Sequence, residues 1–227
     1  MSAFIAPVHY WMYDKVITLR NLEDELAKLL ETEDDLARFN KELAEQLADV
    51  EIDRVSPLEE IVDHQNIHGW LQSKVDIVET RFAKLVTFAL GKGITLEQLI
   101  QTAKEHAKNL AEGIEEEAEK HRGSFIKSYK YQQPKEVFAT LNTFLLEGMP
   151  CDRVSIPLKD SAEEFVWETT ECLHQNYWQR INGDVSNFYK IRNEWIASFV
   201  GNLPKKYHYQ RVEQDGKILN YLSGLEG

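Results

Sequence analysis

Three histidines and two glutamates are spaced so that their side chains could bind a metal ion. His64 and His68 are four residues apart in a segment with helical periodicity, so both imidazole rings would lie on one helix face. If the next helix runs back antiparallel, it brings His121 and Glu117 to the level of His64, and the first helix brings Glu23. Neutral imidazole is a common ligand of transition metals. The spacing predicts a candidate site for a divalent transition metal, and the sequence does not identify a cofactor beyond this possibility.

A structural interpretation of the same histidines stays open. A histidine on an apolar helix face often packs in the core and bonds to a carboxylate, and Glu60 lies one turn before His64. The segment from His64 to His68 reads HQNIH, without the glutamate that zinc proteases place between their histidines. Neither histidine has a glutamate three residues before it, as di-iron bundles require.

Cys172 and His174 form a second candidate, for nucleophilic chemistry. Cys172 lies where a predicted strand passes into a predicted helix, and a helix N-terminus lowers the pKa of a thiol. His174 could serve as its base, and Trp178 would complete a small-molecule pocket between sheet and helix. Residues two apart on a helix point in different directions, and a free cysteine is often a small buried apolar residue. Both interpretations remain open.

Helical periodicity in the first half of the chain predicts the elements that carry the metal candidates. Apolar residues at three-four spacing predict helices over residues 8–31, 34–50, 56–90 and 95–122. Ser56-Pro57-Leu58-Glu59 and Thr95-Leu96-Glu97-Gln98 are capping boxes that start the last two. Short links between these helices predict an antiparallel bundle. The long third and fourth helices would overhang it and need a second domain or a second copy of the chain to cover them.

The second half mixes helix and strand patterns. Its predicted helices cover residues 134–145, 173–181 and 184–200, and its predicted strands cover residues 154–158, 165–172, 207–213 and 217–222. We therefore expect an α+β, mainly helical fold, with an antiparallel helical bundle domain at 1–125 and an α+β domain at 134–227. The second domain would hold a roughly four-stranded antiparallel sheet with packed helices. The boundary is expected near 123–133.

The C-terminal part resembles a known family. A predicted hairpin ends with the strand Phe165–Cys172, and its last residue leads directly into a helix through Tyr177. A second helix contains Phe188-Tyr189, and a closing hairpin has Gly216 at its turn. This pattern is similar to the L-2-amino-thiazoline-4-carboxylic acid hydrolase-like proteins, over roughly the last 75 residues. The resemblance implies the α+β layout. That family carries further Cys and Asp residues where this chain reads FYKIRNEW and GKILNYL, so hydrolase activity does not follow from the resemblance.

Composition narrows the classes of partner. The 227 residues include 38 acidic and 26 basic side chains, a net charge of −12, of which residues 1–122 carry −11. An acidic chain is not expected to bind nucleic acid. The chain has no run of 18 consecutive apolar residues, so a membrane partner is not expected. The start MSAFIAPVHYW lacks the basic and apolar regions of a secretory signal, so none is expected. Two cysteines, Cys151 and Cys172, indicate a reducing cytoplasm.

We therefore expect a cytoplasmic protein that binds a small molecule or a metal and forms a homo-oligomer through its helical domain. A helical scaffold protein without catalysis is one alternative. A hydrolase of a small amide-like or heterocyclic substrate is another. No complete catalytic set stands at recognisable spacing in the sequence, so whether the protein is an enzyme stays open.

Overall fold

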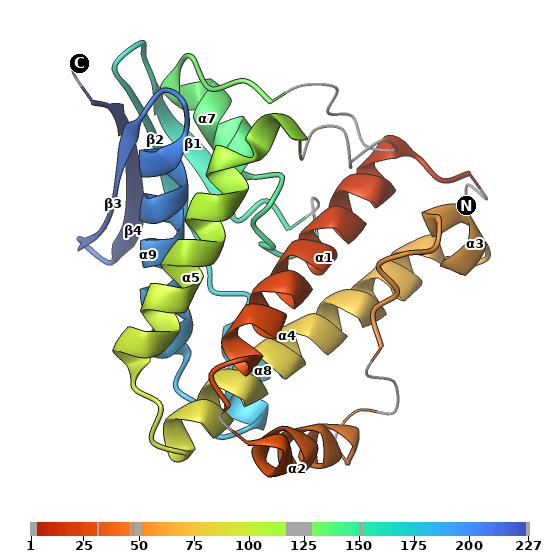
Figure 1. Cartoon of the computed structure of the whole chain (residues 1–227). Coiled ribbons are helices and arrows are strands. Elements are labelled where there is room, and N and C mark those ends of the chain that lie inside the picture. Colours follow the sequence, from red (N-terminus) through yellow and green to blue (C-terminus); the bar gives the residue numbers. More distant parts are fainter. Residues whose placement is uncertain are drawn as a thin grey trace.

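The computed structural model describes residues 4–30, 32–45, 47, 51–116, 129–149 and 152–225. These residues form helices and a four-stranded antiparallel sheet, which confirms the predicted α+β, mainly helical fold (Figure 1). The helices are α1 (Pro7–Ala27), α2 (Glu33–Ala44), α3 (Leu58–Ile61), α4 (Ile67–Gly91), α5 (Leu96–Glu112), α7 (Pro134–Leu141), α8 (Gln175–Arg180) and α9 (Val185–Asn202). The strands are β1 (Ser155–Asp160), β2 (Glu164–Thr169), β3 (Tyr207–Gln214) and β4 (Lys217–Gly224).

The predicted helix over 56–90 is interrupted between α3 and α4. The side chain of Asp63 accepts a hydrogen bond from the backbone N–H of Gln65 at 2.9 Å, which forms a local turn. The side chain of Asn66 then accepts from the N–H of Gly69 at 3.2 Å and caps α4. Short polar side chains that bond to nearby backbone compete with the helix. His64 therefore lies in the connection and not on α4, and the prediction of one continuous helix is wrong.

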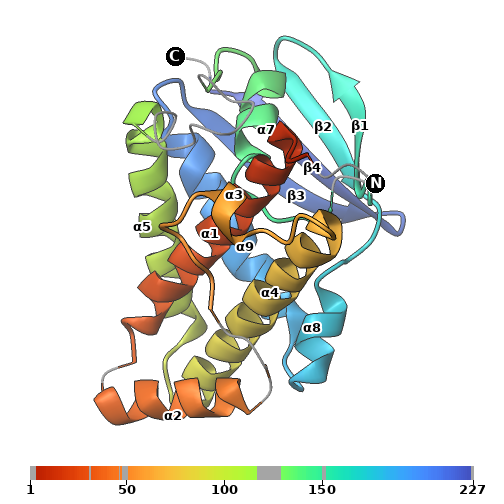
Figure 2. The ribbon, with the colours of Figure 1, turned by 90° about the vertical axis from the view of Figure 1, so that its right-hand side faces the viewer.

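The helices α1 and α4 run side by side in the same direction, whereas the predicted bundle makes its neighbours antiparallel. His9 contacts His68 near the start of both helices, and Glu23 binds Arg81 further along both. The connection through α3 brings the chain back to the start of α1 (Figure 2), where the hydroxyl of Tyr13 donates to a backbone carbonyl of that connection at 2.6 Å. The pair α4 and α5 also differs from the prediction, because α5 packs chiefly along α9 (Figure 1).

The sheet has the strand order β1-β2-β4-β3, and every neighbouring pair is antiparallel. The helices α7 and α9 pack against it. Asp215 and Gly216 both have positive φ at the turn between β3 and β4, as the Asp-Gly pair predicts for a tight hairpin. The edge strand β1 has an irregular register between Pro157 and Lys159. This edge and the segment before it form one wall of the site described below.

The largest buried apolar cluster continues across both halves of the chain. It includes Leu22 of α1, Phe82 of α4 and Ala103 of α5 together with Trp167 of β2 and Phe199 of α9. The two halves therefore share a core in the described residues. The predicted division at 1–125 and 134–227 stays a prediction, and most of its boundary lies outside the described residues.

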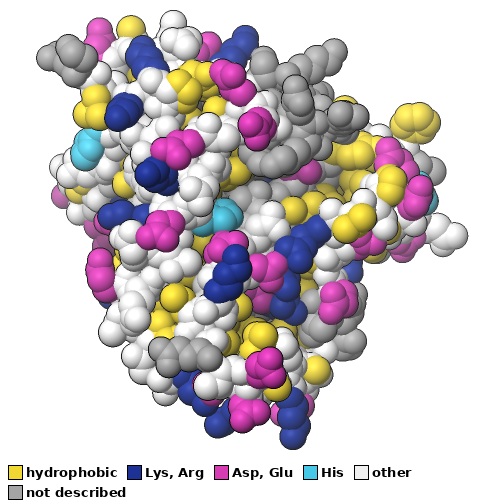
Figure 3. All heavy atoms as spheres, viewed as in Figure 1, with side chains coloured by type: hydrophobic (Ala, Val, Ile, Leu, Met, Phe, Trp, Pro, Cys, Tyr) yellow, Lys and Arg dark blue, Asp and Glu magenta, His cyan; other side chains and the backbone are white. Residues whose placement is uncertain are grey.

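The surface carries mixed charges. On the face that α1 and α5 present in Figure 3, Lys and Arg side chains are interspersed with Asp and Glu side chains. This face therefore has no large patch of a single sign, although the chain carries −12. Among the described helices, none has the length and apolar character needed to cross a membrane.

Candidate functional site

The structure separates the predicted metal ligands that it describes. His64 is exposed, and its Nε2 atom lies 2.8 Å from the backbone carbonyl oxygen of Glu59. Glu23 is buried and accepts two hydrogen bonds from Arg81, at 2.9 and 2.7 Å. Glu23 lies fourteen residues after His9, or about 21 Å along the helix, and His9 is the neighbour of His68. The predicted common face for His64, His68 and Glu23 is therefore wrong.

His9 and His68 form a hydrogen-bonded pair. Their Nε2 atoms lie 3.4 Å apart, and the rings meet edge to face with centroids 5.2 Å apart. The Nδ1 atom of His9 accepts from the backbone N–H of Ala6 at 2.9 Å, so the proton of the neutral ring is on Nε2. His9 then donates to His68. Neither nitrogen of His9 has a lone pair left for a metal ion in this arrangement.

A metal site made from the described residues alone has no support. Among them, no group of three or more His, Cys, Asp and Glu side chains is arranged to hold a metal ion. His121 and Glu117 lie outside the described residues. A divalent-metal site that includes these two residues stays a prediction.

Cys172 and His174 have separate partners. Cys172 is half-buried and lies three residues before α8, and its thiol lies near the hydroxyl of Tyr189. Burial, followed by this contact, raises the pKa of Tyr189. His174 is buried and binds two carboxylates, with Nδ1 2.9 Å from Glu79 and Nε2 3.4 Å from Glu147. No hydrogen bond between described residues joins the thiol to the imidazole.

His174 is an imidazolium at neutral pH. Burial by itself lowers its pKa, but the carboxylates of Glu79 and Glu147 outweigh burial and raise the pKa to about 10. The ring stacks on Phe188 with centroids 4.0 Å apart. Because both nitrogens carry protons, His174 has no lone pair with which to serve as a base. Trp178 is fully buried against Phe188 and lines none of the described cavities. The arrangement does not support the predicted Cys172–His174 catalytic pair.

Four charged side chains alternate in sign through the interior, of which Glu79 and His174 are buried and Glu147 and Arg192 are largely shielded. Glu79 of α4 binds His174, His174 binds Glu147, and Glu147 forms an ion pair with Arg192 of α9, whose Nη2 atom lies 2.7 Å away. Burial by itself raises the pKa of Glu147, but Arg192, with His174 and Lys15, outweighs burial and lowers the pKa to about 2. The chain of ion pairs joins the helical half to the second half. Lys15 lies near Glu147 but forms no ion pair with it.

Lys15 lies at the wall of a cavity of about 430 Å³ between α1 and the segment that leads into β1. Only 3% of its surface is exposed. Its ammonium lies 3.8 Å from the centre of the Trp11 ring, and no described carboxylate or carbonyl accepts a hydrogen bond from it. Burial lowers the pKa of Lys15 to about 7; Glu147 opposes this shift, and Arg192 adds to it. The lining residues are Trp11, Lys15, Asn142, Glu147, Gly148, Met149, Arg153, Val154, Ser155, Ile156 and Pro157.

This cavity has a positive electrostatic character within an acidic protein. Lys15 and Arg153 are its cations, and Arg153 forms no ion pair with another described residue. Glu147 is the one carboxylate among the described lining residues, and Arg192 and His174 already bind it. An anion that enters the cavity therefore meets two cations that lack a carboxylate partner. Attraction in such a partly dry site is stronger than in water.

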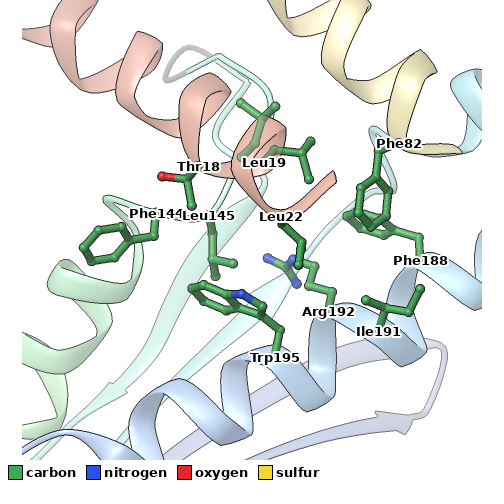
Figure 4. A pocket seen from close by; sticks show the side chains of 11 residues that line it. Thr18, Leu19, Leu22, Phe82, Phe144, Leu145, Phe188, Ile191, Arg192 and Trp195 are labelled. Carbon is green, nitrogen blue, oxygen red and sulfur yellow. The ribbon is translucent and has the colours of Figure 1, made fainter. Parts of the chain in front are cut away.

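A second, smaller pocket lies on the other side of the Glu147–Arg192 pair. It measures about 50 Å³ and is lined almost entirely by apolar side chains, with Leu22, Phe188 and Trp195 around the guanidinium of Arg192 (Figure 4). The Nε atom of Arg192 is buried there without a hydrogen-bond partner. A pocket of this size has room for one to a few water molecules. Arg192 does not line the larger cavity but pairs with Glu147, which does.

Sequence reasoning missed Lys15, Glu147 and Arg192. Two of them carry a recognisable signal, because they are charged residues at helical spacing from buried apolar ones. Lys15 follows Met12 by three positions, and Arg192 follows Phe188 by four. A charge on an apolar helix face must find a partner or change its pKa. Glu147 lies in an irregular segment after α7, where no periodicity marks it.

No family model, no curated protein and no solved structure matches the chain. The resemblance of the C-terminal part to the L-2-amino-thiazoline-4-carboxylic acid hydrolase-like proteins stays a prediction. The function is therefore argued from the chemistry of the site, since a fold alone does not define an activity.

Proposed function

We propose that the protein binds a small organic carboxylate in the cavity beside Lys15. The observation that carries this proposal is Lys15, which lines the cavity, is almost fully buried, and has no hydrogen-bond acceptor for its ammonium among the described residues. A buried charge without a partner costs free energy. A carboxylate in the cavity would supply the partner and recover that cost as binding free energy.

The walls of the cavity favour an anion with an apolar body. Trp11, Ile156 and Pro157 offer apolar contacts, and Arg153 offers a second cation. The volume of about 430 Å³ falls within the range of roughly 300–1,000 Å³ that is common for small-molecule sites. One buried and one exposed cation suit a monocarboxylate better than a highly charged ligand.

This proposal develops the small-molecule part of the expectation from the sequence. Metal binding, assembly through the helical domain, a cytoplasmic location, the scaffold alternative and the hydrolase alternative all stay predictions. No specific contact among the described residues favours any of them over the Lys15 cavity.

The test is a calorimetric titration with matched pairs of probes, butyrate against butyramide and benzoate against benzamide. Wild-type protein is expected to bind the carboxylates at least about tenfold more tightly than the amides, a difference of about 1.4 kcal/mol. Lys15→Met should lose this preference. Lys84→Met is the matched control, because Lys84 is also shielded but pairs with Glu42 at 3.7 Å, away from the cavity. Equal binding of acids and amides, or an unchanged preference in Lys15→Met, would contradict the proposal.

A further inference from the structure

We infer that the ε-amine of Lys15 forms a Schiff base with the carbonyl carbon of a small 2-oxo acid bound in this cavity. The inference rests on the proposed carboxylate site and adds a covalent step at one of its residues. A 2-oxo acid carries its carbonyl next to its carboxylate, so a cation that holds the carboxylate also brings the carbonyl near. Arg153 provides that second cation in the same cavity.

The surroundings of the amine favour a neutral nucleophile. Lys15 is 3% exposed, no described side chain accepts a hydrogen bond from its nitrogen, and the flat face of Trp11 lies 3.8 Å away. Burial and the positive charge of Arg192 both lower its pKa. Desolvation and a neighbouring cation are the two means by which proteins activate lysine amines. At a pKa of about 7, roughly half of the amine is unprotonated at neutral pH.

The charges around the site also suit the product. The nitrogen lone pair attacks the carbonyl carbon, and the carbonyl electron pair moves to oxygen. A proton passes from nitrogen to that oxygen and a carbinolamine forms. The second proton of the nitrogen then goes to the hydroxyl, which leaves as water while the C=N bond closes. The balance needs no oxidant or reductant. The neutral amine gives a neutral imine, and uptake of one proton from solvent then gives the protonated imine. This form carries the same charge as the ammonium form of Lys15, at the same nitrogen and near the same carboxylate of Glu147.

The experiment traps the imine in the full-length protein with pyruvate as the probe and sodium cyanoborohydride as the trapping reductant. Reduction of the imine adds the mass of one pyruvic acid less one oxygen atom to the chain. Peptide mapping of the wild-type protein is expected to find this mass on Lys15, at a rate at least about tenfold above that of any other lysine. Lys15→Arg should lose the fast adduct, whereas Lys84→Arg should keep it.

Butyrate separates the two proposals, because it has the carboxylate but no carbonyl. If butyrate binds and slows the labelling of Lys15, both proposals are supported. If butyrate binds but pyruvate labels Lys15 no faster than surface lysines, the covalent inference is overturned while the carboxylate site stands. If butyrate does not bind, the proposed function fails as well. Peptide mapping of the wild-type protein, labelled with pyruvate in the presence and absence of butyrate, decides between these outcomes even where a variant does not fold.

Discussion

Nη2 of Arg192 lies 2.7 Å from Oε1 of Glu147, and this ion pair leaves Lys15 without a carboxylate of its own. Arg192 reaches Glu147 from α9, and His174 reaches it from the segment before α8. The carboxylate at the cavity wall therefore serves two cations of the interior. The ammonium of Lys15 at the cavity wall is left without a carboxylate in an ion pair.

Replacement of Glu147 by Gln should destabilise the fold strongly. The variant leaves Arg192 and His174 buried with less compensation, and breaking a buried ion pair costs about 3–5 kcal/mol. Urea unfolding at pH 7 measures the change. Glu163→Gln is the control, since Glu163 is exposed in the turn between β1 and β2 and should change stability by less than about 0.5 kcal/mol. Similar values for the two variants would show that the buried pair does not matter.

Lys15 and His174 should act oppositely on stability as pH rises from 7 to 10. The pKa of His174 is about 10 in the folded protein against 6.5 for a free histidine, so its stabilising contribution is complete below pH 6.5 and is lost towards pH 10. The pKa of Lys15 is about 7 against 10.5, so its destabilising contribution fades as pH rises through that window. The two effects offset each other in the wild type.

Lys15→Met should expose the contribution of His174. Its free energy of unfolding is expected to exceed that of the wild type by at least about 1 kcal/mol at pH 7, because an unpaired buried charge is removed. The difference between the two proteins should then shrink steadily as pH rises to 10. Urea unfolding at several pH values measures both curves. A difference that does not depend on pH would mean that Lys15 has an ordinary pKa.

The Glu23–Arg81 pair should show the asymmetry of buried ion pairs. Arg81→Met leaves the carboxylate of Glu23 buried without its main partner and is expected to cost about 3–5 kcal/mol. Because two apolar side chains can fill the same space, Glu23→Leu combined with Arg81→Met should recover most of that loss. Thermal and urea unfolding of the single and double variants give the comparison. A double variant as unstable as Arg81→Met would contradict this account.

The contact between α1 and α4 should weaken in mild acid. Burial, and then the nearby His68, lower the pKa of His9 below 6.5, so the unfolded chain binds more protons than the folded one and stability falls as pH drops below 6.5. Protonation also removes the acceptor at Nδ1 that binds Ala6. Stability of the wild type and of His9→Gln between pH 7 and 5 tests this. The variant should show the weaker dependence on pH, and equal slopes would argue against it.

The sequence predicts the elements well because the signals for them are local. The Thr95–Gln98 capping box forms with both of its hydrogen bonds, at 3.2 and 2.8 Å, and Asp215-Gly216 makes the last hairpin turn. The break before α4 was missed because the apolar seam runs on through it. Asp63 and Asn66 carried the contrary signal, since both residue types favour turns and caps over helix interiors.

The site could be predicted less well because it is assembled from distant segments. Lys15, Glu147 and Arg192 come from three parts of the chain, and no spacing in the sequence relates them. The register estimate for His64, His68 and Glu23 assumed an antiparallel bundle, and the parallel course of α1 and α4 removed its basis. A charged residue at a core position is the useful signal. It identifies single residues but does not show which of them lie together.

The pKa of Lys15, followed by NMR of protein labelled with ¹³C at the lysine side chains, tests the central claim most directly. We expect a value near 7 in the free protein. Saturation with benzoate should raise it, because a carboxylate beside the ammonium favours the charged form. Butyrate should act in the same direction, and benzamide should leave the pKa unchanged. A free value near 10.5, or a pKa that benzoate does not move, would contradict the account of this cavity as a carboxylate site.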